Sequence, residues 1–221
     1  MKQRPIIFNT EMVQAIVDGR KTQTRRAITD KQLSLFKCAA SIGECHYLDD
    51  DINPKSMGYY RQFCQFGEVG DQLYVRETWR LFNSSNECGC SESPCSCPAN
   101  GTVLFKATGD SGESKWKPSI HMPRSCARIL LEVTAVRVER LNEISEQDAK
   151  AEGLQYSSVY QQWGGVEKHS SHKPHSPHWR WYKNPQHAFK SLWNSIYENW
   201  DANPWVWVIE FKVISTTGGA A

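Results

Sequence analysis

The sequence predicts an α+β fold whose strands form one small mixed sheet that closes as a barrel. Three stretches, at 70–79, 126–141 and 205–214, show the alternation of side chains that is typical of β-strands. Two further stretches, at 10–18 and 185–200, repeat apolar residues at helical spacing. Strands separated by helices in this way favour an α+β class, in which helices pack against a sheet.

The first helix is expected over residues 10–18, TEMVQAIVD. Thr10 belongs to the residue types that cap helix N-termini, and Gly19 is the type that commonly follows a helix C-terminus. The apolar face of this helix holds Val13, Ile16 and Val17. The basic octet GRKTQTRR at 19–26 therefore begins where the helix ends, and it is the densest cluster of positive charge in the chain.

The stretch 70–79, GDQLYVRETW, opens with a turn and continues as a strand with two different faces. Glu77 falls on the same face as Leu73 and Val75. A carboxylate that points inward beside apolar side chains would need an arginine partner. Glu77 is therefore a second candidate acid in the chain.

The two later strands carry different patterns. In the stretch 126–141 the apolar alternation runs through Ile129, Leu131 and Val133 and changes phase near Val136, which indicates a β-bulge. The final stretch, WVWVIEFKVI at 205–214, is apolar on both faces at its start. This pattern predicts that the final strand is buried on both sides.

A short helix is expected between these two strands, over ISEQDAKAEG. Ser145 and Asp148 resemble a capping box with Asp in place of Glu, and Gly153 closes the helix. Glu152 then lies at the C-terminal end, where the helix dipole disfavours a carboxylate. This unfavourable position makes Glu152 more interesting than an average surface glutamate. The last helix, at 185–200, starts with a proline suited to a first turn.

Length and charge restrict the possible classes of protein. The 221 residues show no clear linker, so we expect one domain over 1–214 and a disordered tail at 215–221. A formal net charge of +2 is too small for a protein that coats a nucleic acid along its length, so electrostatic attraction has to come from local clusters. No stretch has the character of a membrane span or a signal peptide, so we expect a cytoplasmic protein with no membrane partner.

Half of the eight cysteines lie in one loop, ECGCSESPCSCPANG, whose Ser, Pro and Gly content predicts irregular structure. These four are Cys88, Cys90, Cys95 and Cys97. In a reducing compartment, cysteines are more often free or metal-bound than paired. However, the C-x-C spacing and the short gap differ from the usual paired zinc knuckles. A structural zinc site, two disulfides and a free insertion therefore all stay open for this loop.

A second unusual run is KHSSHKPHSPHW, in which a histidine recurs at every third position. The four histidines are His169, His172, His175 and His178. A three-residue period aligns side chains on a polyproline II strand and not on an α-helix. The run therefore favours a polar, solvated loop or flap over a helical metal site.

Gly19, Lys21 and Arg26 form the pattern G-x-K with Arg at the eighth position, which resembles the signature of ASCH-domain proteins. The segments LEVTAVRVERL, ISEQDAKAEG and VWVIEFKVI follow in the order expected of that family. The resemblance implies a PUA-like β-barrel that acts on RNA or its components. The usual ASCH domain is shorter than this chain, so we interpret three stretches as insertions, as in the longer ASCH proteins of phages and prophages. These insertions lie near 32–66, 84–101 and 154–184.

Some short bacterial ASCH proteins are amidohydrolases that remove the acetyl group from N4-acetylcytidine. Matching their motif to this chain implies Lys21, Thr24 and Glu152 as catalytic residues. The chemistry is reasonable, because a threonine hydroxyl needs an adjacent base and a lysine can act as one when burial or neighbouring cations lower its pKa. We expect Lys21 to activate Thr24, and Glu152 to handle protons for the leaving amine and the deacylating water. No cofactor is expected to be required for this catalysis.

Further charged residues are candidates for contact with the substrate. They are Arg20, Arg25, Arg26, Arg76, Glu77, His121 and Arg124. Alternatives remain open: the octet could form a solvated basic face, and Glu152 could be an ordinary surface carboxylate. The whole protein could also be a PUA-like module that binds RNA or modified nucleic acid, or a ribonuclease that uses the same basic cleft.

Overall fold

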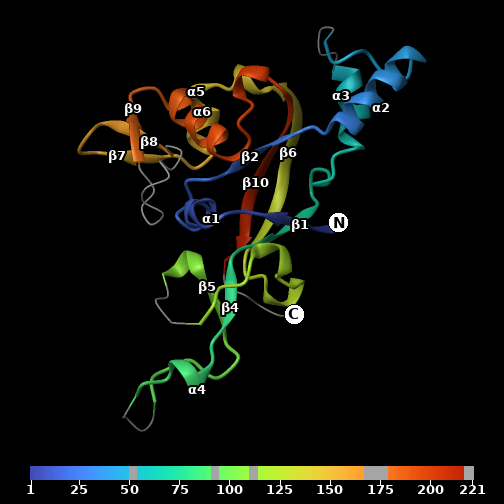
Figure 1. The fold of residues 1–221 in the computed structure, drawn as a ribbon. Helices are drawn as coiled ribbons and strands as arrows, with labels where there is room; N and C mark the ends of the chain where they lie inside the picture. Colours follow the sequence, from blue (N-terminus) through green and yellow to red (C-terminus); the bar gives the residue numbers. More distant parts are fainter. Residues whose placement is uncertain (50–53, 91–94, 110–113, 167–178, 217–221) are drawn as a thin grey trace.

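The computed structural model describes residues 1–49, 54–90, 95–109, 114–166 and 179–216. Its strands are β1 (Gln3–Ile7), β2 (Gln23–Ala27), β3 (Gln72–Arg76), β4 (Trp79–Leu81), β5 (Val103–Phe105), β6 (Leu130–Arg140), β7 (Gln155–Ser157), β8 (Gln162–Val166), β9 (Trp179–Tyr182) and β10 (Trp205–Ser215). Its α-helices are α1 (Thr10–Val17), α2 (Asp30–Ser41), α3 (Pro54–Arg61), α4 (Ser84–Glu87), α5 (Glu146–Ala151) and α6 (Pro185–Ile196). The predicted α+β class is confirmed (Figure 1).

The main sheet has five strands in the order β1-β3-β6-β10-β2. β1 pairs with β3 in parallel, and every other neighbouring pair is antiparallel. The predicted closure into a barrel is not seen: in the part of the chain that the structure describes, β1 and β2 are opposite edges of the sheet. Helix α1 connects these two edge strands and packs Val13 and Ile16 into the core. The sheet is therefore open, and two small sheets, β4-β5 and β7-β8-β9, lie beside it.

Both faces of β10 are buried at its start, as its sequence predicts. Trp207 and Ile209 belong to the main core, which also contains Phe36 and Tyr60 from the region of α2 and α3. Val206 and Val208 belong to a second core together with residues of α5 and α6. Figure 1 shows α5 and α6 on one side of β6 and β10, and α2 and α3 on the other.

The predicted bulge in the long strand is confirmed close to its expected place. The register between β6 and β10 shifts between Glu210, which faces Ala135, and Phe211, which faces Val133. One residue of β6, Thr134, is therefore extra at this point, two positions before Val136. The shift moves the buried alternation of β6 onto Val136 and Val138.

The ends of α1 and α6 differ in part from the predictions. The N-cap of α1 is Asn9, whose side chain accepts a hydrogen bond from the backbone of Met12, and not Thr10, which is the first helical residue. Val17 of the predicted apolar face is exposed. Helix α6 starts at Pro185 as expected but ends at Ile196, and Ile196 is also exposed. The helices α2 and α3 were not predicted.

The short helix α5 forms as its sequence predicts. Ser145 is the N-cap and accepts a hydrogen bond from the backbone of Asp148 at 3.1 Å. Glu152 is the C-cap residue, and Gly153 follows in the left-handed region with φ of +94°. The end of α5 therefore fixes the position of Glu152, between Ala149 and Leu154 of the second core.

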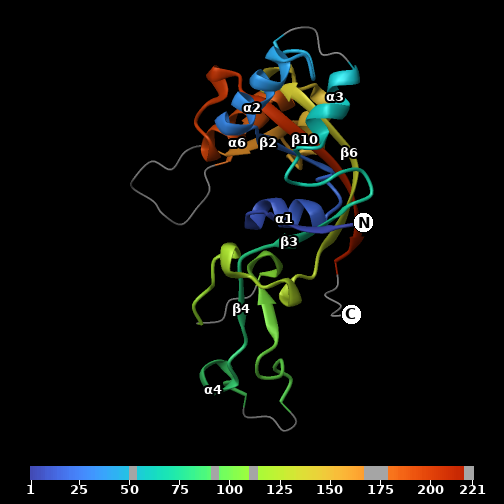
Figure 2. The ribbon, with the colours of Figure 1, turned by 90° about the vertical axis from the view of Figure 1, so that its right-hand side faces the viewer.

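A separate lobe extends from the sheet and is formed by β4, α4 and β5 (Figures 1 and 2). The stretch 70–79, predicted as one strand, is divided: β3 ends at Arg76 in the main sheet, and β4 begins at Trp79 in the lobe. Arg80 and Glu87 form a buried ion pair within this lobe. The four clustered cysteines lie at its tip, after the end of α4.

Some predictions fall outside the described residues. They concern the histidine run with His169, His172, His175 and His178, and residues 217–221 of the predicted tail. Ser215, which the sequence places in the tail, is the last residue of β10. Among the described helices, none combines the length and the apolar character needed to cross a membrane.

Candidate active site

Lys21 lies in the interior of the protein, between the end of α1 and the start of β2. Its backbone N–H donates to the carbonyl of Ala15 at 2.9 Å, and a β-bridge joins Lys21 to Glu152. The side chain of Lys21 is fully buried, and Nζ donates to Oε2 of Glu152 and to the Glu152 carbonyl oxygen, both at 2.9 Å. The structure thus joins the lysine and the glutamate that are 131 residues apart in the sequence.

The close contact between these two segments depends on a glycine. Gly153 has a φ of +94°, a backbone conformation that residues with a Cβ rarely adopt. A Cβ at this position would lie 2.8 Å from Cβ of Ala15 and 2.8 Å from Cβ of Lys21. The AEG motif therefore ends the helix and also leaves room for Lys21 beside Glu152.

We expect Gly153→Ala to lower the free energy of unfolding by about 1–3 kcal/mol more than Gly19→Ala, because overpacking adds to the backbone strain. Gly19 is a matched control, since its φ is +73° and a Cβ added there would meet no atom of the rest of the protein within 4 Å. Urea denaturation of the two variants measures the difference. Equal losses would show that Gly153 serves only as a helix terminator.

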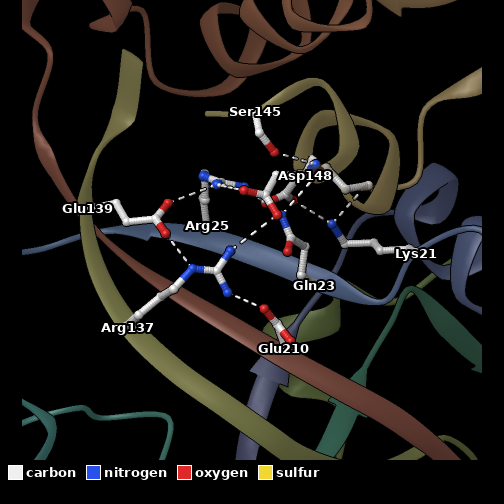
Figure 3. Close-up of polar contacts among 9 residues, drawn as sticks. Lys21, Gln23, Arg25, Arg137, Glu139, Ser145, Asp148 and Glu210 are labelled. Carbon is white, nitrogen blue, oxygen red and sulfur yellow. Dashed lines mark hydrogen bonds and ion pairs between the residues drawn. The ribbon is translucent and has the colours of Figure 1, made fainter. Parts of the chain in front are cut away.

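Arg25 links Glu152 to a wider network of charges. Figure 3 labels the other charged members of this network, Lys21, Arg25, Arg137, Glu139, Asp148 and Glu210. The side chain of Arg25 is fully buried, and Nη1 donates to Glu152 at 3.2 Å while Nη2 donates to Glu139 at 3.0 Å and to Asp148 at 3.1 Å. Arg137 in turn bonds Glu139, Glu210 and Asp148. Because every carboxylate here has a cationic partner, the network keeps buried charge compensated.

The surroundings shift the proton affinities of Lys21 and Asp148. Burial lowers the pKa of Lys21 below its ordinary value; attraction from Glu152 opposes this, and repulsion from Arg26 and Arg25 adds to it. Burial alone would raise the pKa of Asp148, but attraction from Arg25 and Arg137 outweighs it and holds that pKa below its ordinary value. The lysine is thus easier to deprotonate than a solvated one.

Glu152 lies in the wall of two neighbouring cavities. The larger, about 190 Å³, lies between α1, the end of α5, β7, β8 and α6, and is lined in part by Arg20, Glu152 and Gln155. The smaller, about 20 Å³, is lined by Thr24, Arg25, Arg26 and Glu152 together with aromatic residues of α6. Met12, Leu192 and Glu152 line both cavities. The larger cavity has room for a small ligand beside Glu152 and Arg20, whereas the smaller one, lined by a hydroxyl, arginines and aromatic rings, has room for a group of about the size of one water molecule.

The structure therefore brings the three predicted catalytic residues close together, but Lys21 hydrogen-bonds to Glu152 and not to Thr24, the residue that it was expected to activate. Thr24 is buried on β2 and shares the smaller cavity with Glu152. Among the described residues, the hydrogen bonds of the Lys21 ammonium go to Glu152 and not to Thr24. Glu152 is thus the group that adjoins both Lys21 and the cavity of Thr24.

The other arginines of the octet occupy different places. Arg20 is partly exposed, pairs with Asp18 at 2.8 Å and donates to the carbonyl of Gly153 at 2.6 Å. Arg26 donates to the carbonyl of Ile7 at 2.6 Å and lies over the ring of Phe8. Arg20 faces the larger cavity and Arg26 faces the smaller one.

The remaining predicted contact residues form a second group, which does not line these cavities. Glu77 is buried and accepts two hydrogen bonds from Arg128, at 2.9 and 3.0 Å, which supplies the arginine partner that its position requires. Burial raises the pKa of Glu77, and the hydrogen bonds from Arg128 oppose this rise.

Arg76 donates to the carbonyls of Met122 and Ile120. Arg124 bonds Gln3, and His121 lies in a short 3-10 turn before it.

Four residues of the network were missed by sequence reasoning as site residues: Glu139, Asp148, Arg137 and Glu210. One signal for them was present. Arg137 and Glu139 are two residues apart on a strand, so their side chains share a face. Asp148 has the capping position that was predicted, but its carboxylate is also bonded to Arg25 and Arg137.

The side chains of Cys88, Cys90, Cys95 and Cys97 offer sulfur atoms that all lie within 4.8 Å of one another. This grouping is able to bind a metal ion.

Comparisons of the chain with protein-family models, with curated proteins and with solved structures give no match.

Proposed function

We propose that the protein is an amidohydrolase that removes an acyl group from a nucleobase or nucleoside of the N4-acetylcytidine type. The observation that carries this proposal is the buried Lys21–Glu152 pair, whose glutamate lines a cavity of about 190 Å³. A lysine with a lowered pKa next to a carboxylate is a frequent arrangement in catalytic sites. The resemblance to ASCH amidohydrolases at Lys21, Thr24 and Glu152 supports the same reaction.

In the proposed mechanism, transfer of a proton from Lys21 to Glu152 leaves the neutral amine that can act as a base. The Thr24 hydroxyl attacks the amide carbonyl carbon and gives its proton to the Lys21–Glu152 pair. The C–N bond breaks as Glu152 protonates the leaving amine, and an acyl ester remains on Thr24. A water molecule, deprotonated by the same pair, hydrolyses the ester, releases the carboxylic acid and restores Thr24.

The arginines have separate proposed roles. Arg25 holds Glu152 in place from the side away from Lys21, since it donates to the other carboxylate oxygen. Arg20 and Arg26 contact the substrate from the two cavities that they line. We propose that this chemistry needs no metal, and that an ion held by the four cysteines would serve the fold of the lobe.

Thr24 variants test the nucleophile. Thr24→Val removes the hydroxyl at nearly the same volume and should reduce conversion of N4-acetylcytidine to cytidine to background, while Thr24→Ser should retain measurable turnover. The absorbance change from N4-acetylcytidine to cytidine follows the reaction. If Thr24→Val were as active as the wild type, a water molecule and not Thr24 would have to attack the amide.

An RNA-binding module is the second candidate function, and one observation favours it. Tyr156 and Tyr160 are 49 % and 61 % exposed, and they lie on or next to strand β7, whose first residue, Gln155, lines the larger cavity. Exposed rings are able to stack on bases. A binder of polynucleotide should lose affinity steeply with salt, whereas hydrolysis of a neutral nucleoside should depend on salt only weakly.

A further inference from the structure

The four-cysteine cluster, Cys88, Cys90, Cys95 and Cys97, lies apart from the candidate active site. It belongs to the lobe of β4, α4 and β5, which extends away from the main sheet (Figures 1 and 2). None of the four cysteines lines the cavities at Glu152. The cluster therefore needs an explanation of its own.

The sulfur positions match the dimensions of a tetrahedral thiolate site. A Zn–S bond is about 2.3 Å, so the four sulfurs around a tetrahedral zinc ion lie about 3.8 Å apart. In the structure Sγ of Cys88 is 3.3 Å from Sγ of Cys95, Sγ of Cys90 is 3.2 Å from Sγ of Cys97, and all four lie within 4.8 Å of one another. Two of the separations are thus shorter than the value for zinc and none exceeds it by more than about 1 Å, so the four sulfurs are grouped at nearly the spacing that a zinc ion requires.

The alternative of two disulfides agrees less well with the arrangement. All four cysteines are free, and a disulfide needs its sulfurs about 2.05 Å apart. The C-x-C spacing keeps the two pairs near each other along the chain, and the structure brings all four sulfurs within 4.8 Å of one another. Here the amide of Cys97 donates to Sγ of Cys95, which ties one pair to the other. Convergence of all four sulfurs on one point is the property of a metal site.

The lobe also needs an additional source of stability. Its apolar contacts are concentrated at its base, where Trp79 packs with Met122 and Ala127. Beyond the Arg80–Glu87 ion pair, the segment with the cysteines is short, and Cys90 and Cys95 are exposed. Small units with so little apolar core usually depend on a metal or on disulfides to fold.

We propose that Cys88, Cys90, Cys95 and Cys97 bind one zinc ion as thiolates and that this ion folds the tip of the lobe. Binding displaces the four thiol protons into solution and involves no change of oxidation state. A site with four thiolate ligands has no open position for water, so the ion is structural. Soft thiolate ligands favour zinc over magnesium or calcium, which prefer oxygen.

The test measures zinc in the reduced, full-length protein by elemental analysis and by competition with a chromophoric chelator. We expect one zinc per chain in the wild type. Cobalt substitution should give thiolate charge-transfer bands and the strong visible bands of a tetrahedral site. Cys90→Ser should weaken the affinity for zinc at least about tenfold, and Cys38→Ser, which changes an exposed cysteine outside the cluster, should leave it unchanged.

Chelation of the ion should increase hydrogen exchange in the lobe and leave the main sheet protected. The proposal is overturned if the reduced protein binds neither zinc nor cobalt, or if Cys90→Ser binds them as tightly as the wild type. It is also overturned if a thiol titration without reductant shows that the four cysteines form two disulfides. Because the ion is structural and remote, Cys90→Ser should keep its amidohydrolase activity, so this proposal and the proposed function can fail separately.

Discussion

Replacing Lys21 with Met is expected to lower kcat for N4-acetylcytidine hydrolysis by about 10²–10⁴-fold, the usual contribution of a general acid–base group. Methionine fills most of the space of the lysine side chain and removes the amine. Glu152 keeps its hydrogen bond from Arg25 at 3.2 Å, so the buried carboxylate is still paired and the protein should stay folded. Steady-state kinetics and a thermal melt of the same sample measure both effects.

The control for this variant is Lys212→Met. Lys212 is an exposed lysine of β10 and pairs with Glu132 of β6. The Lys212→Met variant should keep the wild-type kcat.

The pH profile of the wild-type enzyme adds a second test of the role of Lys21. In the proposed mechanism the Lys21–Glu152 pair needs one proton, which Glu152 gives to the leaving amine. Because burial lowers the pKa of Lys21, the pair loses this proton at a lower pH than a solvated lysine would, and the rate should fall with rising pH before pH 10.5 is reached. Unchanged kcat in Lys21→Met would rule out Lys21 as the base.

Replacing Arg25 with Met is expected to lower the free energy of unfolding by about 3–5 kcal/mol, the range for a buried ion pair that loses one partner. Arg25 bonds three carboxylates, on Glu139, Asp148 and Glu152. Without Arg25, Lys21 would still pair with Glu152, and Arg137 would still pair with Glu139 and Asp148. Urea denaturation of wild type and variant at neutral pH measures the loss.

Arg20→Met is the control, because Arg20 is partly exposed. This variant loses the pair with Asp18 and the hydrogen bond to the Gly153 carbonyl, and it should lower the free energy of unfolding by no more than about 2 kcal/mol. The two variants should also differ in acid. The lowered pKa of Asp148 contributes stability that is present above its ordinary value of 3.8 and is lost as the pH falls through the lowered pKa. Arg25→Met should lose part of this acid dependence. Equal losses for both arginine variants would show that the network does not stabilise the fold.

Several features of the fold were predictable because local chemistry decides them. The two-sided burial of the final strand follows from WVWVI, where apolar residues occupy both faces. The start and end of α5 follow from Ser145 and Gly153, which act through hydrogen bonds and backbone angles within a few residues. The bulge in β6 follows from the change of apolar phase near Val136.

Other features depend on contacts between distant segments. Helix α2 buries few residues, such as Phe36 and Ala39, so its apolar periodicity in the sequence is weak. The closure of the sheet depends on which edges meet in space, and no local pattern determines this. The octet indicated positive charge but not that Lys21 and Arg25 would be buried against carboxylates from 114 to 131 residues away. Among those carboxylates, Glu152 had a local signal for a site role, its position at the end of a helix.

The most direct measurement of the proposed activity incubates the purified wild-type protein with N4-acetylcytidine and quantifies cytidine and acetate together. The expected result is equimolar release of both products, with release by Lys21→Met slower by at least about 10²-fold under the same conditions. Absence of turnover by the folded wild-type protein, or equal release by both proteins, would contradict the assignment of the Lys21–Glu152 pair as the active site of an N4-acetylcytidine amidohydrolase.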